Sequence, residues 1–111
     1  MPRGDYPGEL EQVVMLAIVR LAEDAYGMSI RREIEQRGGR VLSIGAIYAT
    51  LERLEDKKFI RSYEREPEEG RDGRARRFFE LTKSGVSALQ AAADLHTRMW
   101  AGLRLRRAGR P

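Results

Sequence analysis

Residues 43–58 read SIGAIYATLERLEDKK and combine a helix start with an apolar stripe. Ser43 is of a type that favours the N-cap position, where its hydroxyl accepts a hydrogen bond from the first turn. Apolar residues recur at steps of three and four, which predicts one inward face of a helix over 44–58: Ile44, Ile47, Tyr48, Leu51 and Leu54. The other face carries small and polar residues: Gly45, Ala46, Ala49, Thr50 and Arg53.

Two strand-like runs follow this helix, at 59–64 and 75–81. The segment between them contains Pro67, Gly70 and Gly73, so the two runs predict a β-hairpin. Four arginines gather on its tip and returning arm: Arg71, Arg74, Arg76 and Arg77. Strand alternation would place Arg74 and Arg76 on one face. Glutamates on the outgoing arm leave a solvated, salt-bridged hairpin as the alternative interpretation.

Two helices are predicted upstream. The first begins at Glu9, and one of its faces carries a continuous apolar stripe: Leu10, Val13, Val14, Ala17, Ile18 and Leu21. Its second apolar face comprises Met15, Leu16 and Val19. A helix that is apolar on two sides needs two partners, of which one can be a second subunit. The next helix is predicted over 25–37 and ends at Gly38 and Gly39.

A last helix is predicted from Lys83 to about Leu105, with Thr82 as its cap. Some of its residues alternate at steps of three and four, like the core positions of a coiled coil: Val86, Leu89, Ala93, His96, Trp100 and Leu103. We therefore predict a dimerisation helix over 83–106. The ends, 1–8 and 107–111, are expected to be flexible.

The predicted fold class is mainly α with a small β-hairpin. Three helices followed by a two-stranded hairpin is the order of a winged helix-turn-helix domain, here assigned to residues 9–82. The length of 111 residues suits one small domain. No run of apolar residues is long enough to span a bilayer, and residues 1–5 lack the pattern of a signal peptide. These features predict a cytoplasmic protein.

The composition offers little for catalysis. The chain has no cysteine and a single histidine, His96, and it shows neither a metal-ligand cluster nor a phosphate-binding glycine motif. We therefore expect no enzyme activity, no cofactor and no metal. The net charge is +4, and all but three of the 21 cationic residues are arginines, whose planar side chains suit phosphates and guanine edges.

The helix of 44–58 and the arginine-rich hairpin together indicate binding to double-stranded DNA. A helix enters the major groove by its N-terminal turns, and small residues there, Gly45, Ala46 and Ala49, permit a close approach. Ser43 and the helix start favour a phosphate. Thr50 and Arg53 are the candidates for base edges, and Tyr48 is either a core anchor or a phosphate donor. Phosphate contacts are assigned to three hairpin arginines: Arg71, Arg74 and Arg76.

The chain resembles the PadR family of bacterial transcription regulators. The resemblance spans about residues 9–85 and rests on four segments in order: LEQVVML at 10–16, AYGMSI at 25–30, SIGAIYATLERLE at 43–55 and GRARRFFELTKSG at 73–85. It implies a homodimeric winged-helix protein, usually a repressor, whose C-terminal helix packs on the partner's first helix. It also implies, from some members, that flat aromatic effectors bind near the dimer interface, where Met99 and Trp100 are the candidate pocket residues.

The dimer interface is accordingly assigned to two helices: Val13, Met15, Leu16, Val19, Leu89, His96, Trp100 and Leu103. The leading hypothesis is a homodimeric repressor that binds a pseudo-palindromic operator and is released by a small aromatic effector. The alternative hypothesis is a winged-helix protein-interaction module without sequence-specific DNA binding.

Overall fold

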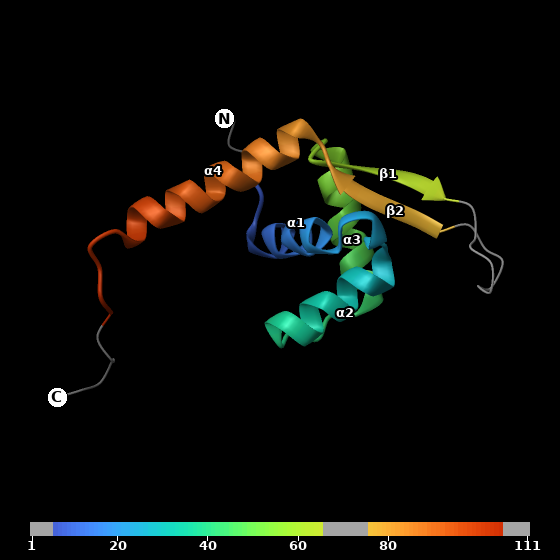
Figure 1. The fold of residues 1–111 in the computed structure, drawn as a ribbon, viewed down its shortest axis with the longest axis horizontal. Helices are drawn as coiled ribbons and strands as arrows, with labels where there is room; N and C mark the ends of the chain where they lie inside the picture. Colours follow the sequence, from blue (N-terminus) through green and yellow to red (C-terminus); the bar gives the residue numbers. More distant parts are fainter. Residues whose placement is uncertain (1–5, 66–75, 106–111) are drawn as a thin grey trace.

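The computed structural model describes residues 6–65 and 76–105. Along the chain it contains α1 (Glu9–Leu21), the short 3₁₀ helix η2 (Ala22–Asp24), α2 (Gly27–Gly38), α3 (Ile44–Asp56), β1 (Ile60–Arg65), β2 (Arg76–Leu81) and α4 (Lys83–Trp100). The first three helices form a cluster from which the hairpin projects on one side and α4 on the other (Figure 1). The predicted fold class, mainly α with one antiparallel hairpin, is confirmed.

The core lies where α1, α2, α3 and the hairpin meet. Its largest fully buried side chains come from all four elements: Val14, Met15, Ile30, Ile47, Leu51, Leu54 and Phe79, with Thr50 among them. The predicted inward stripe of α3 is right for its central positions, but Ile44 and Tyr48 are 37% and 45% exposed. The inward face of α3 is thus rotated toward Thr50.

The second helix begins two residues later than predicted, because Ala25 and Tyr26 are extended and pair with β2. The Phe79 backbone N–H donates to the Ala25 carbonyl oxygen at 2.9 Å, and Tyr26 forms a β-bridge with Phe78. These contacts add a short third strand-like segment to the hairpin, in which Ile60 pairs with Leu81 and Arg65 with Arg76. Tertiary pairing therefore sets the start of α2.

The third helix ends at Asp56 because the chain turns left-handed just beyond it. Lys58 has φ 65°, and the Phe59 N–H donates to the Leu54 carbonyl at 3.0 Å. The last helix ends at Trp100, short of the predicted boundary near Leu105, and Gly102 follows with φ 77°.

The start of α4 is pinned to the turn between α3 and β1. The Thr82 hydroxyl donates to the Lys58 carbonyl at 2.7 Å, and Gly85 lies so close to that turn that a Cβ atom on it would sit 1.9 Å from the Phe59 carbonyl oxygen. Beyond Ala92, every described residue of α4 is exposed. The second half of α4 therefore extends away from the body of the chain (Figure 1).

Residues 6–8 are held against α1, contrary to the expectation of a flexible leader over 1–8. Pro7 is buried, the Gln12 side-chain amide donates to its carbonyl at 3.0 Å, and the Gly8 N–H donates to the Glu11 carboxylate at 2.7 Å. Residues 1–5 and 107–111, the rest of the predicted flexible ends, lie outside the described residues. No helix of the described ranges is long and apolar enough to cross a membrane.

Candidate nucleic-acid interface

The N-terminal turns of α3 form a small, accessible surface. The Ser43 side-chain oxygen accepts a hydrogen bond from the Ala46 N–H at 3.0 Å, which confirms the predicted N-cap. Gly45, Tyr48 and Ala49 are exposed, whereas Ala46 is half-buried. Because none of Gly45, Ala46 and Ala49 has a long side chain, the helix backbone there is open to close approach.

Tyr48 lies across the start of α2. Its hydroxyl oxygen is 2.4 Å from the position that a Cβ atom on Gly27 would occupy, so this site has room only for glycine while the ring stays in place. Tyr48 is thus both an exposed polar side chain and the contact that sets how closely α2 and α3 approach. At 45% exposed, Tyr48 is not a core anchor, and its role as a phosphate donor stays a prediction.

Thr50 is not on this surface. It is 1% exposed, and its hydroxyl donates to the Ala46 carbonyl at 2.8 Å. The expectation that Thr50 reaches a base edge is therefore corrected, because its side chain faces the core and its hydroxyl bonds back to the preceding turn, as mid-helix threonines often do.

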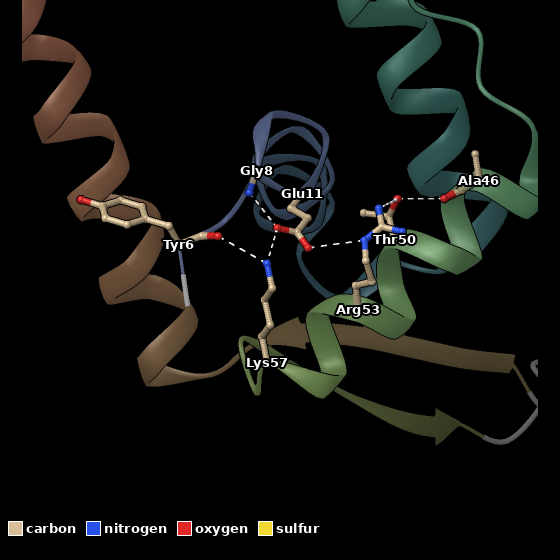
Figure 2. Close-up of polar contacts among 7 residues, drawn as sticks. All are labelled: Tyr6, Gly8, Glu11, Ala46, Thr50, Arg53 and Lys57. Atoms are coloured by element: carbon tan, nitrogen blue, oxygen red, sulfur yellow. Dashed lines mark hydrogen bonds and ion pairs between the residues drawn. The ribbon is translucent and has the colours of Figure 1, made fainter. Parts of the chain in front are cut away.

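Arg53 is tied to the protein by both ends of its guanidinium group (Figure 2). Its Nε lies 3.6 Å from the Glu11 carboxylate, and its Nη2 donates to the Thr50 hydroxyl at 3.1 Å. The side chain is still 53% exposed. Arg53 therefore lies at the edge of the α3 surface in a fixed position and makes polar contacts inside the fold.

Glu11 is the centre of this network and was missed by the sequence analysis. Glu11 is 4% exposed, and its carboxylate accepts hydrogen bonds from Lys57 Nζ at 2.8 Å and from the Gly8 N–H (Figure 2). Burial raises the pKa of Glu11, but these hydrogen bonds and the charges of Lys57 and Arg53 outweigh it, so the pKa lies below its usual value. The spacing of the sequence could have revealed that Glu11 is buried. Glu11 lies three residues before Val14 and seven before Ile18, so it shares their buried helix face.

The end of the hairpin nearest the 66–75 segment contains stacked aromatic rings and arginines. Phe78 packs edge-on against Tyr26 at 5.5 Å between ring centres and stacks with Tyr63 at 6.0 Å. The Arg65 guanidinium lies 3.8 Å from the centre of the Phe78 ring, and that of Arg76 lies 4.5 Å from the centre of the Tyr26 ring. Arg76, a predicted wing residue, is therefore placed at the junction of the hairpin and α2.

The remaining hairpin arginines differ in their surroundings. Arg77 pairs with Glu55 of α3 at 2.6 Å, which ties the returning strand to the helix. Arg65 also donates to the Glu23 carbonyl at 2.7 Å. Arg71 and Arg74, two predicted phosphate contacts, lie outside the described residues.

Apolar side chains are exposed on two helices that were assigned to a dimer interface. Leu16 and Val19 on α1 are 49% and 56% exposed. Trp100 at the end of α4 is 53% exposed, and Leu103, which lies beyond that helix, is 61% exposed. The other assigned residues are His96, which is exposed, and Val13 and Leu89, which are half-buried.

Met15 does not belong to this surface. It is 0% exposed inside a single chain, which corrects its assignment to the interface: α1 turns Met15 into the core together with Val14 and Ile18. The candidate pocket residues Met99 and Trp100 are 67% and 53% exposed, so the described residues of one chain do not enclose a ligand around them.

Residues 15–91 match the family model described as the transcriptional regulator PadR-like family. The chain belongs to this family. It is therefore a DNA-binding transcription regulator rather than an enzyme. No curated protein matches the chain.

Solved structures of the PadR family share this fold. A PadR family transcription regulator from Clostridium difficile has a TM-score of 0.65 and 25% identity, over 80% of this chain and 88% of that one. A PadR-like transcription factor from Bacteroides fragilis has a TM-score of 0.67 and 23% identity, over 84% of each chain. A PadR-like regulator from Bacillus cereus has a TM-score of 0.61 and 21% identity, over 85% of this chain and 93% of that one.

Proposed function

We propose that this PadR-like regulator is a homodimeric repressor that binds a pseudo-palindromic operator. The observation that carries the proposal is the exposed apolar end of α4. Leu95, Met99 and Trp100 there are 39%, 67% and 53% exposed, on the half of the helix that extends away from the rest of the chain. Such a surface is typical of a subunit interface. Two-fold symmetry of the protein would then match two-fold symmetry of the operator.

The first helix supplies a matching surface for the partner's α4. A groove of about 190 Å³ runs between α1 and α2, with an apolar lining that includes Val13, Leu16 and Ile34. Leu16 and Val19 continue the apolar surface along α1. We propose that Val13, Leu16 and Val19 face the partner's Leu89, His96, Trp100 and Leu103.

The DNA-facing surface is proposed to centre on the first turns of α3. Ser43, Gly45, Ala46, Tyr48 and Ala49 would face the major groove, with Arg53 at the edge of that surface. Arg76 of the hairpin would contact the phosphate backbone beside the groove, and Arg71 and Arg74 stay proposed phosphate contacts on the sequence pattern alone. A repressor acting on chromosomal DNA would work in the cytoplasm.

Release by a small aromatic effector completes the proposal. Met99 and Trp100 are exposed in one chain, and two copies of this end of α4 would enclose a mostly apolar space at the dimer axis. A ligand bound there would alter the spacing of the two α3 helices and thereby weaken operator binding.

The test combines mass and binding measurements. Sedimentation equilibrium should give the mass of two chains at micromolar concentration, and the dimer should bind the DNA upstream of its own gene more tightly than an unrelated duplex of equal length. A monomer would contradict the symmetric-operator proposal. Equal affinity for both duplexes would contradict operator recognition, and no affinity even at low salt would favour the protein-interaction module instead.

A further inference from the structure

The tyrosine just before α2 holds two arginines from different elements. The Tyr26 hydroxyl accepts a hydrogen bond from Arg32 Nη2 at 3.1 Å, and the Arg76 guanidinium lies over its ring at 4.5 Å. Arg32 belongs to α2 and Arg76 is the first residue of β2. We call Tyr26, Arg32 and Arg76 the Tyr26 cluster.

The tyrosine ring is itself fixed, so the two arginines are held in defined positions. Tyr26 packs against Phe78 with the ring planes at 69°, and its backbone pairs with the same residue. Its N–H donates to the Ser29 hydroxyl oxygen at 2.9 Å. A cation stacked on an aromatic face keeps its N–H edge available to other acceptors, and holding it there lowers the entropic cost of binding.

Charge distinguishes the Tyr26 cluster from other arginines of the domain. Within the described ranges, neither Arg32 nor Arg76 forms an ion pair with a carboxylate, whereas five other arginines with exposed side chains do: Arg37, Arg40, Arg53, Arg61 and Arg77. Two guanidinium groups held by one tyrosine, neither of them in an ion pair with a described carboxylate, form a local excess of positive charge. The natural complement of such a site is a phosphate, which guanidinium groups bind through paired hydrogen bonds.

The Tyr26 cluster adjoins the surface of α3. Gly27, the next residue along the chain, is in contact with Tyr48 on the exposed face of α3. On its other side Tyr26 is paired with β2, and Figure 1 shows the start of α2 beside the hairpin. The cluster therefore lies between the helix proposed to enter the groove and the hairpin proposed to flank it.

We propose that Arg32 and Arg76, held by Tyr26, bind one backbone phosphate of the DNA duplex at the junction of α2 and the hairpin. This site rests on the proposed DNA-binding surface and adds a contact that fixes the register of α3 on the duplex. Because phosphates are the same in every sequence, the site contributes affinity without sequence preference.

The experiment measures duplex affinity as a function of salt for Arg32→Gln, Arg76→Gln and the double variant. Two labelled duplexes are used, the DNA upstream of the gene and an unrelated one of equal length. Each single variant should lose several-fold to about tenfold in affinity for both duplexes, and the slope of log affinity against log salt should shrink by about one when the phosphate contact is lost. Arg40→Gln is the matched control, since Arg40 lies just beyond the same helix, is 45% exposed and is paired with Glu9. It should change the affinity less than about twofold.

The Tyr26→Phe variant tests how much the positioning of Arg32 contributes, separately from the charges of the two arginines. It removes the hydroxyl that orients Arg32 but keeps the ring under Arg76 and both charges, so we expect an unchanged salt slope and an affinity lower by up to about threefold. If the arginine variants behave like Arg40→Gln while the wild type binds DNA, the phosphate site is wrong and the proposed function stands. If the wild type binds neither duplex at low salt, the DNA-binding surface fails, and this site fails with it.

Discussion

At the scale of single residues, a few polar side chains hold separate helices together, although their neighbours in the sequence do not indicate this role. Glu11 is a buried carboxylate on an apolar helix face, yet it has hydrogen bonds from Lys57 and Gly8 and an ion pair with Arg53. Buried charge is tolerated only when it is paired in this way. Glu11 therefore fixes the N-terminus of α1 to the C-terminal half of α3.

Glu11→Gln should lower the free energy of unfolding at neutral pH by about 1–2 kcal/mol, less than for a fully buried charge because Lys57 and Arg53 reach solvent. The Glu11 pKa is lowered in the folded state, so its stabilisation is present above the unfolded pKa of about 4.3 and is lost as pH falls through the folded value. Urea unfolding from pH 7 to pH 3 measures this. The difference in unfolding free energy between variant and wild type should shrink as the pH falls, and a constant difference would contradict the prediction.

Gly27 and Tyr48 should be coupled in stability. Gly27→Ala alone should cost about 1–2 kcal/mol, because the new methyl group displaces the Tyr48 ring. In a Tyr48→Ala background the same change should be neutral or slightly stabilising, since alanine favours helix. A double-mutant cycle by chemical denaturation gives the coupling energy. Additive effects would mean that the ring moves aside without cost.

At the scale of elements, the junction of α4 with the α3–β1 turn decides where the last helix points. The contact is between backbones: Gly85 lies against the Phe59 carbonyl, and Thr82 caps the helix while donating to Lys58. Backbone atoms cannot rotate away as a side chain can. The direction of α4, and with it the geometry of any dimer, therefore depends on this glycine.

Gly85→Ala should destabilise the chain by about 2–3 kcal/mol, the usual cost of overpacking against atoms that cannot yield. Thermal unfolding followed by circular dichroism measures it. Gly38→Ala is the control, because the same methyl group at the end of α2 would meet open space and should change stability by less than about 1 kcal/mol. Equal effects of the two changes would show that α4 does not depend on the close approach.

At the scale of the whole molecule, one chain has a complete core but leaves two apolar surfaces uncovered. Leu16 and Val19 lie on α1, and Met99 and Trp100 lie on the outer half of α4. The helix-turn-helix body has its own buried core, whereas the residues of α4 beyond Ala92 are exposed in the single chain. Dimerisation would therefore stabilise α4 more than it stabilises the body.

Trp100→Glu should raise the dissociation constant of the proposed dimer by at least about tenfold, because it would place a charge in the proposed apolar interface. Sedimentation velocity over a concentration series measures the constant, and the melting temperature of the wild type, but not of the variant, should rise with protein concentration. Val41→Glu is the control, since Val41 is 70% exposed on the loop between α2 and α3. If the Trp100→Glu variant dimerised as tightly as the wild type, the end of α4 would not be part of the interface.

The sequence by itself determined the order of elements, the hairpin and the caps at Ser43 and Thr82, because these follow from local periodicity and from hydrogen bonds within one turn. It did not determine which side of each helix is turned toward the core. Whether Thr50 and Met15 point inward depends on which neighbours cover α3 and α1, and the apolar patterns allowed either orientation. Only the tertiary structure brought Glu11 to Arg53, and Tyr26 to Arg76, since these pairs are far apart along the chain. The proposed DNA-binding surface depends on such contacts, which periodicity does not encode.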